Sequence, residues 1–305
     1  IMLEKIRNKE KVLYLCKNKN LAQIINLEIS NKIDDDKKYF QSLNVDSTKK
    51  LKDESYDLIV FDEAQDIIRS EYIDKFIGLL NPTKLKNGFL FVGDFENQDI
   101  YSRAYLNKAQ NILNNSGIFF NQHRLSVNLR NNRPLGEYIA DLINTPVLWQ
   151  NFQLDIEMSF PSKETAKSDL DFNLTGNWYE KLNLAIKFMR EEGKISTTNI
   201  TVLCSSNESI NNLLYCQIEG IKFKRVSDNI DSFLNKNNDD DVVFCETIHQ
   251  FKGLESQFVI VLMDYINKRK DEDPGEYFRK LIYVAASRAN FGTSILTSKR
   301  LGDAI

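Results

Sequence analysis

Two adjacent acidic residues, Asp62 and Glu63, directly follow the hydrophobic run Leu58–Phe61. A short run of apolar residues predicts a buried strand of a parallel sheet, and ligands bind where such strands end. There Asp62 can hold Mg²⁺, which needs only one or two protein oxygens. Glu63 can take a proton from a water that attacks a phosphate. The pair therefore favours a phosphoryl-transfer site over the alternative, a charged turn at the start of a helix.

A second strand, predicted over Phe89–Val92, also ends in polar residues, here Gly93 and Asp94. The glycine would allow a tight turn after the strand. Gln98 lies beyond this turn and could sense the terminal phosphate of a bound nucleotide. Taken by itself, the motif also fits a turn whose side-chain amide is satisfied locally.

Further strands are expected where short apolar runs are bounded by polar residues. These runs are Val12–Cys16, Ile118–Phe120, Ile200–Cys204, Val242–Cys245, Phe258–Met263 and Thr293–Thr297. Between them, apolar residues at helical spacing predict helices around Leu21–Leu27, Leu182–Met189 and Phe278–Ala285. Strands that alternate with helices predict an α/β fold with mostly parallel sheets.

The length of 305 residues suggests two domains. Two similar α/β halves that meet near residue 125 would account for it, so we predict domains at 1–124 and 125–305. The net charge of −3 excludes a protein that coats nucleic acid through overall positive charge. Any contact with nucleic acid must come from a local basic surface.

Several features favour a cytoplasmic protein. No apolar run approaches the ~20 residues of a transmembrane helix, and the first residues lack the apolar core of a signal peptide. The four cysteines lie far apart in the sequence, which favours free thiols in a reducing compartment over disulfides or a zinc site. They are Cys16, Cys204, Cys216 and Cys245.

Six segments carry the pattern of a known family. They are Val12–Ala22, Asp62–Asp66, Gly93–Tyr101, Leu125–Arg130, Thr247–Glu255 and Leu281–Ala289. In this order they resemble motifs Ia, II, III, IV, V and VI of superfamily 1 helicases of the UvrD/Rep class. The resemblance covers nearly the whole chain, and the order of the motifs makes it specific. It implies two RecA-like domains with mostly parallel sheets, the first truncated at its N-terminus.

The resemblance implies ATP and Mg²⁺ as cofactors and assigns roles to three residues of the first domain. Asp62 would bind Mg²⁺, and Glu63 would be the catalytic base. Gln98 would read the γ-phosphate and relay its loss.

Three residues of the second domain would also contact the nucleotide. Arg130 and Arg288 would contact the phosphates, because fixed guanidinium groups stabilise a transferring phosphoryl group. Glu255 would contact the nucleotide near its ribose. Judged singly, Arg130 could equally be a surface residue, and Arg288 could form a salt bridge at a helix end.

The resemblance also implies single-stranded DNA, or RNA, as a partner. Asn18, Lys19 and Lys252 would contact its backbone, and His249 would face the strand or the interdomain cleft. Arg103 stands where related motors carry a stacking Trp, and its planar guanidinium can stack on bases. Binding through phosphates is expected to weaken as the salt concentration rises.

One motif of the family, the phosphate-binding sequence G-x-x-x-x-G-K-[ST], has no match. Ile1–Lys9 resemble the remainder of the helix that this loop opens. We therefore expect a fragment of an ATP-dependent helicase or translocase that by itself hydrolyses ATP negligibly, because the loop's backbone N–H groups and Lys are missing. The alternatives are a nucleotide-switched nucleic-acid-binding module, associated with a nuclease or defence protein, and a nucleotidase without a nucleic-acid partner.

Overall fold

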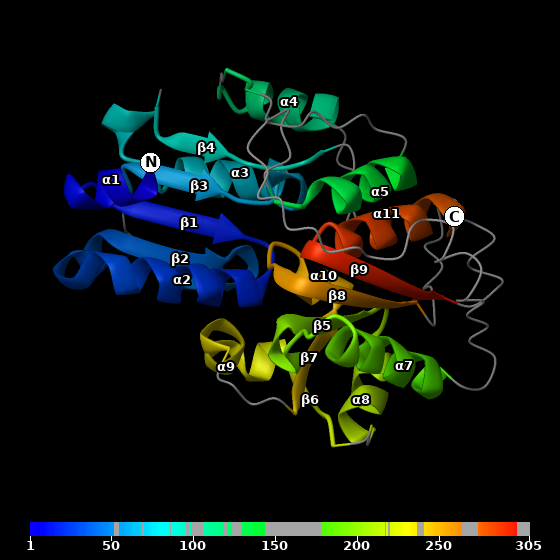
Figure 1. The fold of residues 1–305 in the computed structure, drawn as a ribbon. Helices are drawn as coiled ribbons and strands as arrows, with labels where there is room; N and C mark the ends of the chain where they lie inside the picture. The colour runs from blue at the N-terminus through cyan, green and yellow to red at the C-terminus, as the bar shows by residue number, and fades with distance from the viewer. Residues whose placement is uncertain are drawn as a thin grey trace. The chain divides into compact units, whose positions relative to one another are not determined.

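Two parallel β-sheets with flanking helices organise the part of the chain that the computed structural model describes (Figure 1). Each sheet belongs to one of two compact units, Ile1–Arg124 and Leu125–Ile305. The structure describes residues 1–51, 55–68, 70–85, 87–95, 98, 106–118, 121–123, 130–143, 178–216, 218, 220–236, 241–263 and 274–297. Strands and helices alternate along the chain, so the predicted α/β class is confirmed.

The first unit contains a sheet with the strand order β2-β1-β3-β4, in which every pair is parallel. Its strands are β1 (Val12–Cys16), β2 (Phe40–Asn44), β3 (Leu58–Phe61) and β4 (Phe89–Phe91). Its α-helices are α1 (Met2–Arg7), α2 (Lys19–Ile33), α3 (Ser70–Ile77) and α4 (Leu106–Asn115). Short 3-10 helices are η1 (Asp34–Tyr39), η2 (Val45–Lys50), η3 (Ala64–Asp66) and η4 (Pro82–Lys84).

The core of the first unit fixes the end of β3. All residues of the central strands β1 and β3 are buried, whereas all residues of the edge strand β2 are only partly buried. Phe61, the last residue of β3, stacks on Phe91 with ring centroids 4.8 Å apart. It also meets Phe76 of α3 edge-on at 5.4 Å. These aromatic contacts hold the residue that immediately precedes Asp62.

The second unit contains a parallel sheet with the strand order β6-β7-β5-β8-β9. Its strands are β5 (Ile200–Cys204), β6 (Lys222–Arg225), β7 (Val242–Thr247), β8 (Ser256–Met263) and β9 (Ala289–Thr297). Its α-helices are α5 (Arg133–Ile143), α7 (Trp178–Glu191), α8 (Asn207–Tyr215), α9 (Ile230–Asn235), α10 (Ile248–Phe251) and α11 (Pro274–Ala286). Its 3-10 helices are η5 (Thr197–Asn199) and η6 (Val226–Asp228).

Helices from distant parts of the sequence cover this second sheet. Leu182 and Ile186 of α7 and Ile210 of α8 pack in one buried cluster with residues of β5 and β8. Helix α11 packs against α5, β8 and β9, and Figure 1 shows α5 and α11 side by side. The sheet therefore lies between two helical layers, as a parallel sheet requires.

The sequence predicts the central strands better than the edge strands. Seven of the eight predicted strands are present within a few residues of their expected bounds. The strand predicted at Ile118–Phe120 is wrong at Ile118, which lies outside any strand, and its other two residues lie outside the described ones. Strands β2 and β6 were not predicted, and both occupy sheet edges.

Membrane and thiol features agree with the sequence. Within the described residues, no helix combines the length and apolarity needed to cross a bilayer. All four cysteines are free, and Cys16, Cys204 and Cys245 are buried. Burial, reinforced by the nearby Glu246 carboxylate, raises the pKa of Cys245 to about 12. Such a thiol stays protonated and unreactive near neutral pH.

Candidate functional site

The predicted acidic pair lies at the carboxyl edge of the first sheet, beside the end of β4. The Val92 amide donates to Phe61 O at 2.8 Å, and the Ala64 amide donates to Val92 O at 2.8 Å. The Asp62 amide donates to Leu15 O of β1 at 2.9 Å. The ends of three strands are thus joined around Asp62, as expected for a ligand-binding edge of a parallel sheet.

Both carboxylate oxygens of Asp62 accept a hydrogen bond from the first unit. Oδ1 accepts from the Glu63 amide at 2.9 Å, and Oδ2 accepts from the Tyr14 hydroxyl. Burial of the ring, together with the Asp62 charge, raises the pKa of Tyr14 well above its usual value, so the hydroxyl remains a donor. Tyr14 therefore orients the Asp62 carboxylate, a role that the sequence did not predict.

Glu63 has a left-handed backbone, with φ 49° and ψ 48°. This conformation costs energy in any residue with a Cβ and is common at functional sites. The side chain is held by Gln65, whose Nε2 donates to Glu63 Oε2 at 2.6 Å. The Glu63 carboxylate is therefore fixed next to Asp62 but remains partly exposed, as a general base must be.

Gly93 is needed for a different reason from the one predicted. A Cβ built on Gly93 would lie 2.2 Å from Gln65 Oε1 and 3.0 Å from the Ala64 amide nitrogen. Its φ lies outside the left-handed region, so the tight turn expected after β4 is not what requires a glycine. The glycine instead lets the end of β4 approach the residues that position Glu63.

The residues at this edge fit Mg²⁺. Asp62 and Glu63 are partly exposed residues with carboxylate oxygens, which are ligands that Mg²⁺ prefers. Among the described residues, no cluster of three or more His, Cys, Asp or Glu side chains could hold a metal ion. Mg²⁺ does not require such a cluster, because it keeps most of its waters.

The other predicted residues of the first unit have varied surroundings. Gln98 is half-buried, whereas Arg103 lies outside the described residues. Asn18 is buried, and its Oδ1 accepts from the Asn20 amide at 2.8 Å, which caps the start of α2. Lys19, at the start of the same helix, is exposed. Of this pair, only Lys19 presents its side chain to a ligand in the described conformation.

Two predicted nucleotide contacts of the second unit form an ion pair. Arg130 Nε and Glu255 Oε1 are 2.5 Å apart, and their side chains are 36% and 42% exposed. The segment after Arg130 is tied to the start of β9, where Asn132 Nδ2 donates to Phe291 O at 2.8 Å. Folding therefore brings Arg130 next to Glu255 across a long stretch of sequence.

Arg288 is almost completely buried, with 1% of its surface exposed. Its Nε donates to Val284 O at 3.1 Å, and its Nη2 donates to Ser287 Oγ at 3.0 Å. These bonds satisfy the carboxyl end of α11. A direct contact with phosphate, which the resemblance implies, therefore requires the guanidinium group to reorient.

The segment Thr247–Glu255 forms a short helix and a turn. Thr247 Oγ1 accepts from the Gln250 amide at 3.2 Å and caps α10. His249 Nε2 lies 3.2 Å from the hydroxyl of Tyr277 on α11. Lys252 is 1% exposed, so its predicted contact with nucleic acid also requires a change of conformation. Gly253, with φ 87°, allows the turn that leads into β8.

A buried ion pair supports this segment and was missed by sequence reasoning. Glu246, in β7, has no exposed surface, and its Oε1 lies 3.0 Å from Arg225 Nη2. Its two oxygens also accept from the Thr247 amide at 3.0 Å and the Ser227 amide at 3.1 Å. Arg225 Nη2 donates further to Asn207 Oδ1 at 2.9 Å. The signal available in the sequence was an acid within an apolar strand.

We expect Arg225→Ala to lower the free energy of unfolding by about 3–5 kcal/mol, because it leaves the buried Glu246 carboxylate without its counterion. Urea titration of the 305-residue chain measures this change. Arg133→Ala is the matched control, since the Arg133–Glu137 pair is exposed and should contribute less than about 1 kcal/mol. Equal losses in the two variants would contradict the role assigned to Arg225.

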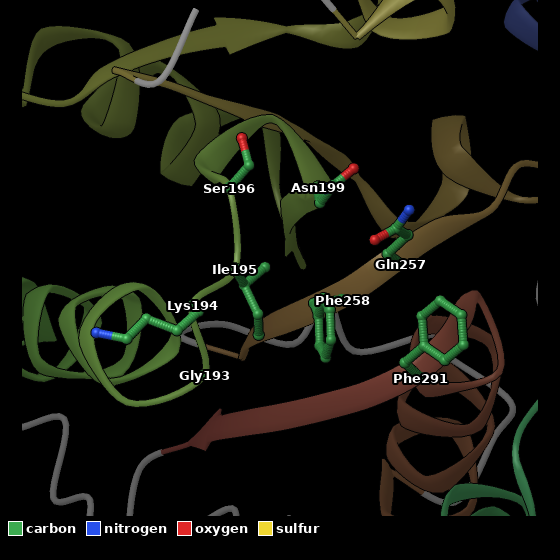
Figure 2. Close-up of a pocket in the computed structure, with 8 residues that line it drawn as sticks. All are labelled: Gly193, Lys194, Ile195, Ser196, Asn199, Gln257, Phe258 and Phe291. Carbon is green, nitrogen blue, oxygen red and sulfur yellow. The ribbon is translucent and has the colours of Figure 1, made fainter. Parts of the chain in front are cut away.

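A cavity of about 220 Å³ lies in the second unit, at the amino ends of β5, β8 and β9. Figure 2 shows the residues that line it. Ile195, Phe258 and Phe291 form its apolar part. Its other lining residues are Gly193, Lys194, Ser196, Asn199 and Gln257. None of the predicted site residues lines it, and it contains no acid–base pair. The chemistry suggested by the sequence therefore lies elsewhere.

One segment of the second unit matches a known protein family. Residues 242–291 match the UvrD-like helicase C-terminal domain. The matched segment contains both Thr247–Glu255 and Leu281–Ala289, the two stretches that resemble motifs V and VI. No curated protein matches the chain.

Proposed function

We propose that this chain, whose residues 242–291 match the UvrD-like helicase C-terminal domain, is part of a UvrD/Rep-like superfamily 1 motor that couples ATP hydrolysis to movement on single-stranded nucleic acid. The observation that carries the proposal is the family match over residues 242–291. The parallel sheet of the first unit, with Asp62 and Glu63 at its carboxyl edge, supports it independently.

In the proposed reaction, Glu63 accepts the proton of the water that attacks the γ-phosphate. Its carboxylate is held by Gln65, and the residue is partly exposed. Asp62, oriented by Tyr14, would hold Mg²⁺. Bound Mg²⁺ would neutralise developing charge on the phosphates. Gln98 responds to the presence of the γ-phosphate.

The second unit supplies the remaining proposed contacts with ATP. Arg130 and Arg288 would stabilise the phosphates in the transition state. Glu255, which now pairs with Arg130, would turn to the ribose when nucleotide binds. Exchange of the Arg130–Glu255 bond for contacts with nucleotide would tie ATP binding to a local rearrangement.

Nucleic acid is the proposed partner, with single-stranded DNA as the preferred substrate and RNA as the competing one. Lys19 contributes an exposed charge near the end of β1. Asn18 caps the start of α2, the helix to which Lys19 belongs. His249 would contribute from α10, Lys252 would do so from the following turn after a change of conformation, and Arg103 would contribute by stacking. Such contacts are made with the sugar-phosphate backbone of the nucleic acid and so do not depend on its base sequence.

The decisive experiment compares ATP turnover with and without oligonucleotide. We expect the full-length gene product to hydrolyse ATP faster when single-stranded DNA is added. We expect the 305-residue chain to bind the same oligonucleotide but to show negligible turnover, because it has no G-x-x-x-x-G-K-[ST] sequence. Substantial turnover by the 305 residues would contradict our assignment of the missing phosphate contacts.

The second candidate is a nucleotide-switched nucleic-acid-binding module, associated with a nuclease or defence protein, that never unwinds a duplex. Such a switch needs nucleotide binding but no turnover. An unwinding assay on a tailed duplex separates the two. ATP-dependent strand separation by the full-length protein supports the motor, and nucleotide-dependent binding without separation supports the switch.

A further inference from the structure

A basic cavity of about 240 Å³ lies at the amino edge of the first sheet. Lys11 directly precedes β1, and Tyr39 directly precedes β2. The complete lining is Lys11, Lys37, Lys38, Tyr39, Phe40, Gln41 and Tyr56. Asp62 follows the opposite, carboxyl edge of this sheet, so the cavity is separate from the site described above.

Three lysines of this cavity have no carboxylate partner among the described side chains. Lys11, Lys37 and Lys38 are exposed, and within the described side chains none of them forms an ion pair with a carboxylate. Two of the nearby acids, Asp36 and Asp57, have other contacts. Asp36 pairs with Lys9. Asp57 accepts from the Lys11 backbone amide at 2.9 Å and from Asn81 Nδ2 at 3.3 Å. The lining itself therefore contains three ammonium groups and no carboxylate.

One lysine of this cavity, Lys38, contacts an aromatic ring. The ammonium group of Lys38 lies 5.2 Å from the centroid of the Tyr39 ring, and that of Lys9 lies 5.5 Å from it. Cation–π contacts of this kind restrain ammonium groups without neutralising them. On the other wall, the buried Tyr56 donates its hydroxyl to Gln41 Oε1. Lys38 is thus partly ordered before a ligand arrives, which lowers the entropic cost of binding.

We propose that this basic cavity binds phosphate groups of a nucleic-acid strand, as a second contact on the edge of the sheet opposite Asp62. Ammonium groups bind phosphate as point charges and do not select a base. The family match implies nucleic-acid binding, and a strand carries successive phosphates that can meet several lysines at once. The proposal relies on that binding but not on ATP chemistry.

The test measures binding of a fluorescein-labelled oligothymidylate to the 305-residue chain by anisotropy over a range of salt concentrations. Each phosphate contact on a single strand contributes about 0.7 to the slope of log K against log salt. The double variant Lys37→Glu, Lys38→Glu should therefore reduce the slope by about 1.4. The same relation predicts a roughly 25-fold higher Kd at 0.1 M salt. Far-UV circular dichroism checks that the fold is intact.

The matched control is Lys32→Glu, Lys75→Glu, which changes the net charge equally at exposed positions of α2 and α3 outside the cavity. It should leave the salt slope nearly unchanged, and equal weakening by the two double variants would overturn the proposal. Tyr39→Leu keeps every lysine but removes the ring, and we expect an intermediate loss of affinity.

Inorganic phosphate and ATP, each added as a competitor, distinguish the source of the phosphate. Displacement of the oligonucleotide from the wild-type chain only at much higher competitor concentration supports a nucleic-acid site. Displacement at equal phosphate concentration would show a site for free anions instead. Because no ATP turnover enters these measurements, the cavity and the proposed motor can fail separately.

Discussion

Replacing Glu63 with Gln should lower ATP turnover by the full-length protein by about 10²–10⁴-fold while leaving ATP binding unchanged. Gln is nearly isosteric with Glu and can still accept the hydrogen bond from Gln65 Nε2. It cannot accept a proton from the attacking water. The left-handed backbone at this position strains both residues equally, so stability should be preserved. Steady-state turnover and equilibrium binding of labelled ATP measure the two quantities.

Glu28→Gln provides the control for Glu63→Gln. Glu28 is exposed on α2 of the same unit, so the substitution removes the same charge away from the site. It should leave turnover unaltered. Normal turnover by Glu63→Gln would show that another group is the base and would remove Glu63 from the proposed mechanism.

Arg288→Ala is expected to reduce turnover by about 10³-fold or more, the contribution of a guanidinium that stabilises a transferring phosphoryl group. Arg288→Lys should also be impaired, because it keeps the charge but loses the planar fork. Loss of the bonds to Val284 O and Ser287 Oγ should lower the free energy of unfolding by about 1–3 kcal/mol. Turnover and urea unfolding, measured on the same preparations, compare the two effects.

Ser287→Ala separates the catalytic from the structural role of Arg288. It removes the hydroxyl that accepts from Arg288 at the end of α11 but keeps the guanidinium group. We expect reduced stability with nearly normal turnover. If Ser287→Ala loses as much turnover as Arg288→Ala, or if turnover only follows the folded fraction, Arg288 is a structural residue of the helix end.

Most central strands were predictable from local sequence, because a strand covered on both faces must be apolar throughout. Val12–Cys16, Leu58–Phe61 and Ile200–Cys204 match β1, β3 and β5 residue for residue. The edge strands β2 and β6 read Phe-Gln-Ser-Leu-Asn and Lys-Phe-Lys-Arg. Solvent covers part of an edge strand, so its sequence need not be apolar, and pairing with a neighbour defines it.

The sequence by itself determined the α/β class and the position of Asp62 and Glu63 at a strand end, since both follow from contiguous residues. Only the tertiary structure decided which side chains hold them. Tyr14 reaches Asp62 because β1 and β3 are neighbours in the sheet. Pairing of this kind depends on strand order, which no local pattern encodes.

Folding decided the second-unit contacts in the same way. The bond between Arg130 and Glu255 and the support that Glu246 receives from Arg225 join residues from separate elements of the chain. Apolar periodicity indicates which residues of a helix or strand face the core, because the spacing of buried positions is fixed by the geometry of that one element. A charged residue's partner is fixed only when separate elements pack, and so it appears only in three dimensions.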